Sequence, residues 1–241
     1  MKVLIMESTF SGRRRGLHLA KSLAYYCDKV YYLTNVPLCG SRHKVLFRPR
    51  VAEDGFLIIE VSNPCSRLPR RGLIMRAIIH CINGLLFFLA IIRSLKVLID
   101  TDIIIVGDMP PFTKVPAFIL KKLTGALLFV DVREPLGEDI AAFISNRWLI
   151  AFFKFINPMI NKLTFAISDG IITHTRPLIY FIAKYSHKLA HVVYNPIDTR
   201  AFRPMNKANA VARLAGILPV AVSYTHLRAH ETEAELVCRL L

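Results

Sequence analysis

The chain has 241 residues, 54% of them hydrophobic, and a formal net charge of +15. This length allows one large domain, or one domain and the beginning of another, with a sizeable core in either case. The surplus of positive charge predicts an anionic partner. The sequence shows no recognised nucleic-acid-binding motif, so we expect that partner not to be DNA or RNA.

Four cysteines lie outside the C-terminal tail: Cys27, Cys39, Cys65 and Cys81. No two of them have the spacing of a zinc site or of a redox pair, and the N-terminus carries no cleavable signal. These features predict a reduced cytoplasmic setting and no bound metal.

The N-terminal residues predict a β-loop-α-β unit, which is the opening unit of a Rossmann-like domain. Residues 1–6 form a short apolar run typical of a central parallel strand. Apolar residues then recur at helical spacing across 19–27, and 29–34 predict the next strand.

The loop before this first helix is a candidate ligand site, because free N–H groups and the helix dipole favour anions there. Its candidate residues are Gly12 and Arg13. Alternatively, Gly12 only makes the turn and Arg13 lies in a solvated helix start. The loop lacks the glycine fingerprint of dinucleotide-binding folds, so NAD binding has little support.

Two long apolar segments, residues 73–98 and 147–167, predict helices that either pack on the core or contact a membrane. The first is interrupted by charges and falls short of the roughly 20 apolar residues that a spanning helix needs. The second mixes lysines with aromatic residues and contains Pro158, which we expect to break or kink it. An anionic membrane surface is therefore a predicted partner, with the protein peripheral at the cytoplasmic face of the plasma membrane.

The remaining strands and helices alternate along the chain. Strands are predicted around 45–47 and at 56–61, 102–108, 125–132, 169–175 and 191–194, and helices at 113–123 and 177–185. This alternation predicts an α/β fold built on a Rossmann-like, doubly wound parallel sheet.

Several short motifs occur in a specific order. The strand at 102–108 is followed by Met109-Pro-Pro111, the strand at 125–132 runs into Asp131-Val-Arg-Glu-Pro135, and Ser168-Asp-Gly-Ile-Ile-Thr173 opens a later strand. The last strand leads into Asn195-Pro-Ile-Asp198 and then Phe202-Arg-Pro204. This order resembles the N-terminal half of glycosyltransferase family 4 enzymes, which have the GT-B fold. Glu134 replaces the family's usual second aspartate, and no aromatic residue precedes Pro135.

The resemblance implies an acceptor-side domain of an enzyme that moves a sugar from a nucleotide-diphosphate-sugar to a cell-envelope glycan or lipid-linked acceptor. The nucleotide sugar is a substrate, and no cofactor is implied. The implied catalytic residues are Asp131 and Glu134, and the implied substrate-binding residues are Gly12, Arg13, Arg133, Asn195 and Asp198. Alternatively, Arg133 and Glu134 pair with each other and only hold their loop.

The resemblance also implies a division of the chain. Residues 1–204 correspond to the acceptor-side domain, and 205–221 to a linker and the start of a donor-binding domain. Residues 222–241 resemble translated sequencing-adapter sequence, so we expect them to lie outside the fold. In the family the residues that bind the diphosphate lie in the C-terminal domain, so we expect this chain alone to be inactive.

Two alternatives remain open at this point. One is a non-catalytic, membrane-associated sugar-binding module. The other is a different Rossmann-type, nucleotide-dependent enzyme, which nucleotide binding by the N-terminal residues alone would favour.

Overall fold

The computed structural model describes residues 1–7, 15–35, 47–52, 55–61, 73–107, 113–135, 147–195 and 206. Contacts divide the chain into two compact units, Met1–Pro196 and Ile197–Leu241. Only Asn206 of the second unit is described. The predicted boundary at residue 204, and the predicted nature of 205–221 and 222–241, therefore stay predictions.

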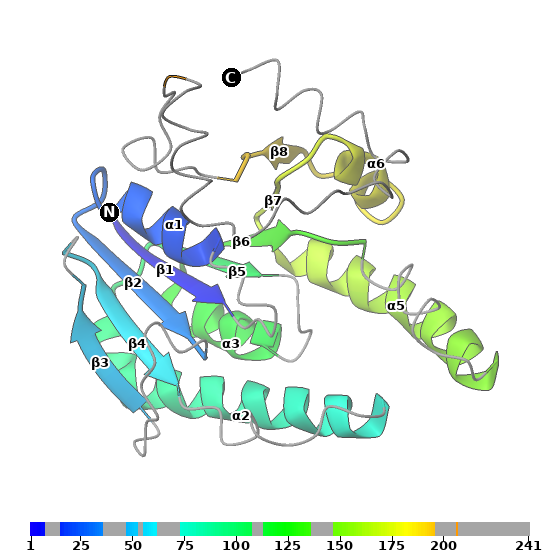
Figure 1. The fold of residues 1–241 in the computed structure, drawn as a ribbon, viewed down its shortest axis with the longest axis horizontal. Coiled ribbons are helices and arrows are strands. Elements are labelled where there is room, and N and C mark those ends of the chain that lie inside the picture. The colour runs from blue at the N-terminus through cyan, green and yellow to red at the C-terminus, as the bar shows by residue number, and fades with distance from the viewer. Residues whose placement is uncertain are drawn as a thin grey trace. The chain divides into compact units, whose positions relative to one another are not determined.

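A sheet of eight strands forms the centre of the described part of the first unit (Figure 1). The strand order is β3-β4-β2-β1-β5-β6-β7-β8, and all neighbours are parallel except β3 and β4. The strands are β1 (Lys2–Glu7), β2 (Lys29–Thr34), β3 (Phe47–Val51), β4 (Leu57–Val61), β5 (Ile103–Gly107), β6 (Leu127–Val132), β7 (Gly170–Thr173) and β8 (Ala190–Val192). The predicted fold class is confirmed.

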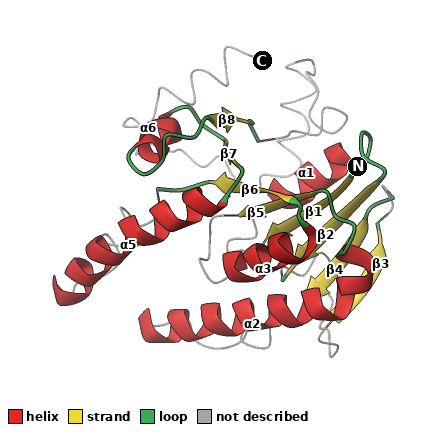
Figure 2. Cartoon of the chain, turned by 180° about the vertical axis from the view of Figure 1, so that it is seen from behind, coloured by secondary structure: helices red, strands yellow, loops and turns green. Residues whose placement is uncertain are grey.

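The central strands are buried on both faces, which explains their continuous apolar sequences. Residues Val3 to Met6 of β1 are each at most 2% exposed. On one face their neighbours come from α1 (Arg15–Leu23). On the other face the sheet packs against α2 (Leu73–Leu98), α3 (Lys114–Thr124), α5 (Arg147–Ile167) and α6 (Pro177–Ala183) (Figure 2).

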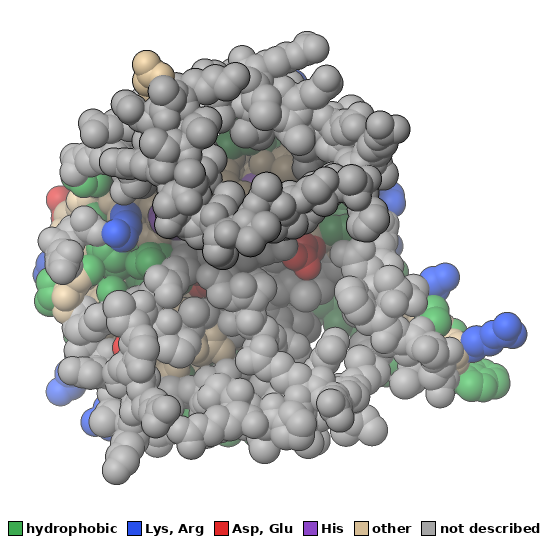
Figure 3. All heavy atoms as spheres, in the orientation of Figure 1, with side chains coloured by type: hydrophobic (Ala, Val, Ile, Leu, Met, Phe, Trp, Pro, Cys, Tyr) green, Lys and Arg blue, Asp and Glu red, His purple; other side chains and the backbone are tan. Residues whose placement is uncertain are grey.

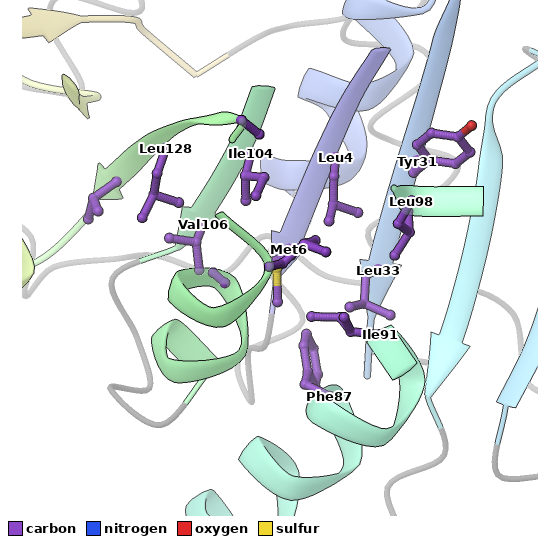
Figure 4. Close-up of a cluster of buried hydrophobic side chains, with 14 of the residues drawn as sticks. Leu4, Met6, Tyr31, Leu33, Phe87, Ile91, Leu98, Ile104, Val106 and Leu128 are labelled. Atoms are coloured by element: carbon purple, nitrogen blue, oxygen red, sulfur yellow. The ribbon is translucent and has the colours of Figure 1, made fainter. Parts of the chain in front are cut away.

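The larger core lies between the sheet and α2. Phe87 and Ile91 of α2 are buried against Leu4 and Met6 of β1 and Leu33 of β2 (Figure 4). This packing accounts for one side of the apolar segment 73–98. The core alternative for this helix is therefore correct for its inner face.

The chain crosses the sheet in two opposite directions. From β1 it moves through α1 to β2 on one side, and from β5, the neighbour of β1 on the other side, it moves through α3 to β6. Right-handed crossovers then require α1 and α3 to lie on opposite faces of the sheet. The carboxyl ends of β1 and β5 meet where the direction changes, which is where ligands bind in open α/β sheets.

One local prediction is wrong, and another is wrong in one of its two alternatives. The first helix begins at Arg15 and ends at Leu23, because Arg15 is anchored to the sheet and the chain turns at Ala24–Tyr26. Of the two effects predicted for Pro158, a break is excluded, because α5 continues across it to Ile167, and the kink stays a prediction. A proline removes one intrahelical hydrogen bond, and the residues on both sides of Pro158 keep the helix.

Among the described helices, none is both long enough and apolar enough to cross a membrane.

Candidate functional site

Glu7 and Asp131 are buried acidic side chains at the carboxyl edge of the sheet. Glu7 ends β1, Asp131 lies one residue before the end of β6, and each is 1% exposed. A buried carboxylate is costly unless it is paired with a cation or well hydrogen-bonded. The surrounding side chains provide such partners.

Two arginines neutralise these carboxylates. The Arg15 Nε and Nη2 atoms donate to Asp131, with a shortest distance of 3.0 Å to Oδ2. Arg133 Nε donates to the same Oδ2 at 2.9 Å, and its Nη1 donates to Glu7 Oε1. The two guanidinium groups and two carboxylates form one chain of charge-assisted bonds with no net charge, which we call the carboxyl-edge cluster.

Burial and neighbouring charges shift the pKa of Tyr32 and Arg133 at this cluster. Burial and the Glu7 charge raise the pKa of Tyr32 far above its ordinary value, so its hydroxyl stays protonated and donates to Glu7. Burial opposes the charge of Arg133, but Glu7 and Asp131 outweigh it and raise the pKa of that guanidinium. Both shifts favour the protonated forms of Tyr32 and Arg133, which are the forms that donate to Glu7.

Gly16 allows α1 to approach this cluster closely. Its backbone N–H donates to Glu7 Oε1 at 3.1 Å. A Cβ at this position would lie 2.6 Å from Glu7 Oε2 and 3.0 Å from a ring carbon of Tyr32. The start of the helix thus takes part in binding a carboxylate of its own chain, as anions do at helix N-termini.

Arg15 also holds the segment that follows the last strand. Its Nη2 donates to the Val193 carbonyl at 2.8 Å, and its Nη1 donates to Asn195 Oδ1 at 2.8 Å. One guanidinium therefore joins the start of α1, the end of β6 and the residues after β8. The arrangement fixes Asn195 at the carboxyl edge.

His174 follows β7 at the same edge. Its Nδ1 is buried and has no hydrogen-bond partner. Burial, reinforced by the charge of Arg15, lowers the pKa of this imidazole. The lowered pKa favours the neutral form of His174.

The structure brings several predicted site residues together. Arg15 donates to both Asp131 and Asn195, and Arg133 donates to Asp131. The half-buried Glu134 follows Arg133 in the chain. Gly12, Arg13 and Asp198 lie outside the described residues. Both Asp131 oxygens accept bonds from guanidinium groups, which favours a positioning role over proton transfer. Its catalytic role and that of Glu134 stay predictions.

Glu7, Arg15, Gly16 and Tyr32 were not predicted as site residues from the sequence. Glu7 had a usable signal, because it is the charged residue that ends an otherwise apolar strand at the edge where ligands bind. Arg15 had none, because Arg13, Arg14 and Arg15 are indistinguishable in sequence. Arg133 is bonded to Asp131 and Glu7. Its pairing with Glu134 stays a prediction.

No family model matches the chain, and no curated protein matches it in sequence. Solved structures do match. Sucrose-phosphate synthase from Thermosynechococcus elongatus superposes with a TM-score of 0.60 at 13% identity, over 91% of this chain and 53% of its own. Anabaena HepE in complex with UDP-glucose superposes with a TM-score of 0.52 at 12% identity, over 89% of this chain and 49% of its own. Os79 from O. sativa in complex with U2F and trichothecene superposes with a TM-score of 0.51 at 11% identity, over 89% of this chain and 57% of its own.

At these identities the likeness concerns the fold. It shows the α/β Rossmann-like fold of GT-B glycosyltransferases, with the polar cluster at the edge where such sheets bind ligands. The chain spans about half the length of the solved proteins it matches.

Proposed function

We propose that residues 1–204 are the acceptor-side domain of a GT-B glycosyltransferase resembling family 4. The enzyme would move a sugar from a nucleotide-diphosphate-sugar to a cell-envelope glycan or a lipid-linked acceptor. The nucleotide sugar is a substrate, and no cofactor is required. We expect transfer to need a donor-binding unit in addition to this domain.

One observation carries this proposal. About 90% of the chain superposes on half of HepE, a protein solved with UDP-glucose, and on half of sucrose-phosphate synthase. Os79 has also been solved with UDP. The match to half of each protein supports a domain that works with a second one.

The carboxyl-edge cluster suits the acceptor side of such a reaction. Its charges are internally balanced, so it can position neutral hydroxyl groups without attracting a stray ion. Asp131 holds Arg15 and Arg133, and Arg15 in turn orients the exposed Asn195 amide. Glu134 directly follows Arg133 and is half-buried at this edge, and its carboxylate would accept a hydrogen bond from a sugar hydroxyl. Stabilisation of the departing diphosphate would fall to the donor-binding unit.

A binding experiment with matched variants tests the proposal. The full chain is applied to a panel of immobilised envelope glycans and lipid-linked oligosaccharides. We expect binding that Glu134→Gln weakens about tenfold or more, because a charge-assisted hydrogen bond is lost. Asp28→Asn is the control, since Asp28 lies exposed before β2 at the amino edge. Equal loss in both variants, or tight nucleotide binding without glycan binding, would contradict the assignment.

A further inference from the structure

One helix exposes its apolar side. Trp148, Phe152, Phe155, Met159 and Leu163 of α5 follow each other at intervals of three or four residues and are 54–87% exposed. This spacing places them along one face of the helix. The same helix buries Asn157, Asn161 and Thr164. Among the described side chains of α5, only Phe165 at its C-terminal end is a fully buried apolar side chain of the core, and most of its aromatic row faces outward.

The neighbouring helices continue this pattern. On α2 the residues Leu85, Leu89 and Ile92 are exposed at helical spacing, although the opposite side of that helix is core. Val115, Ile119 and Leu123 form a similar exposed row on α3. Figure 2 shows α2, α3 and α5 on one side of the sheet. We call the outward side of these three helices the apolar face.

The charges on this layer have one sign. The sequences of α2, α3, α5 and α6 contain no aspartate or glutamate. Exposed basic side chains stand beside the apolar rows: Arg93, Lys96, Lys122, Arg147, Lys154 and Lys162. Figure 3 shows basic and hydrophobic side chains together at the outer end of α5. The nearest acids after these helices, Asp100 and Asp169, are already paired with Lys2 and Lys121.

We propose that the apolar face binds the surface of an anionic lipid bilayer, with α5 inserting its aromatic row among the headgroups. Exposed aromatic and aliphatic rows whose charged neighbours on the same helices are all cations suit a lipid interface. A second copy of the chain is a poor occupant, because two acid-free basic faces would repel each other. An acidic protein would pair with the cations, but it would also need apolar side chains that fit the exposed rows on three separate helices.

This contact has a consequence for the candidate site. Helix α5 connects the parallel strands β6 and β7 and so begins at the carboxyl edge of the sheet. Trp148 therefore lies at the end of α5 that starts from the carboxyl edge of the sheet, where Glu7 and Asp131 also lie. Lipid binding through α5 would keep the carboxyl edge near the bilayer.

The chain contains its own probe of this contact. Trp148 is its single tryptophan, and its side chain is 87% exposed. On adding vesicles of phosphatidylglycerol and phosphatidylcholine to the full chain, we expect its emission to shift to shorter wavelength. Lipids brominated in the acyl chains should quench it, and the protein should float with the vesicles. Pure phosphatidylcholine vesicles should give neither effect.

Charge reversal tests the location. Lys154→Glu with Lys162→Glu should lower vesicle partitioning more than about tenfold, since each basic residue near an anionic surface contributes separately. Lys21→Glu with Lys29→Glu makes the same change in net charge on α1 and β2, away from the apolar face, and should lower it far less. Phe155→Ser with Leu163→Ser should abolish quenching by brominated lipids.

Four outcomes would overturn the proposal. The first two are no flotation with anionic vesicles and equal loss in the two charge-reversal variants. The third is a tryptophan shift that depends on protein concentration without lipid, which would assign the face to a second copy. The fourth is a shift caused only by an acidic polypeptide, which would assign the face to a protein partner. The vesicle assay contains no sugar or nucleotide, so a failed glycosyl-transfer assay leaves its result unchanged.

Discussion

At the scale of single residues, the carboxyl-edge cluster depends on the close contacts that Glu7 makes with its hydrogen-bond donors. Glu7 receives bonds from the Gly16 N–H, from the Tyr32 hydroxyl and from Arg133. These partners come from the start of α1, from β2 and from the loop after β6. A buried acid therefore joins three parts of the sheet edge.

Gly16→Ala should destabilise the protein. The new methyl group would overlap the Glu7 carboxylate and contact Tyr32, so α1 or Glu7 must move. Overpacking of this kind costs about 1–3 kcal/mol in the free energy of unfolding. Chemical denaturation measures it, with His18→Ala on the exposed side of the same helix as the control. Equal stability of Gly16→Ala and wild type would show that the close approach is not structurally important.

Replacing Asp131, which both arginines of the cluster bind, should destabilise the protein more than replacing Arg15. Asp131→Asn leaves both Arg15 and Arg133 facing a neutral group in a buried site and should cost about 3–5 kcal/mol. Arg15→Met leaves Asp131 still paired with Arg133, so we expect a smaller loss. Denaturant titration of the two variants checks this order. A larger loss in Arg15→Met would contradict the bonding described for the cluster.

His174 should make the fold sensitive to acid. Its folded pKa lies below its ordinary value of 6.5, so the unfolded chain binds a proton more readily than the folded one. Stability should therefore fall as pH drops below 6.5 and stop falling below the folded pKa. His174→Asn should remove this part of the pH dependence and leave the slope above about pH 7 unchanged. Identical pH profiles from thermal unfolding would contradict the shift.

At the scale of secondary-structure elements, α5 shows where sequence reasoning ends. Its position and length were predictable from the apolar run between Arg147 and Ile167. Its orientation was not, because apolar residues occur on more than one side and the core alternative fitted equally well. Only the packed structure shows that Asn157 and Asn161 are inside and Phe155 is outside.

The end of α5 is held by a distant lysine. Lys188 Nζ donates to the carbonyls of Phe165 and Ala166 at 2.8 Å, and also to that of Ser168. A cation at these carbonyls satisfies free acceptors and the helix dipole. Lys188→Met should lower the free energy of unfolding by about 1 kcal/mol. Lys162→Met on the exposed side of α5 is the control, and an equal effect of both substitutions would contradict the capping role.

At the scale of the whole molecule, the sheet was largely predictable and the site only partly. The sequence alternates between apolar runs typical of parallel strands, such as β1 and β5, and segments with helical periodicity. This alternation determines the fold class with little ambiguity. Asp131, Arg133 and Asn195 were found because they lie in motifs directly after strands. Arg15 and Tyr32 were missed because their roles depend on contacts across more than a hundred residues and on neighbouring strands, which no local pattern records.

The central claim is that the carboxyl edge of this sheet faces a sugar acceptor. Photo-cross-linking of the full chain with diazirine-bearing envelope glycans, mapped by mass spectrometry, tests it most directly. We predict cross-links at residues that follow β6, β7 and β8, among them Glu134, His174 and Asn195. Excess unlabelled glycan should remove these cross-links, and UDP alone should not. Cross-links confined to the amino edge, around Asp28 and Asp102, or competition by UDP alone, would contradict an acceptor-side domain.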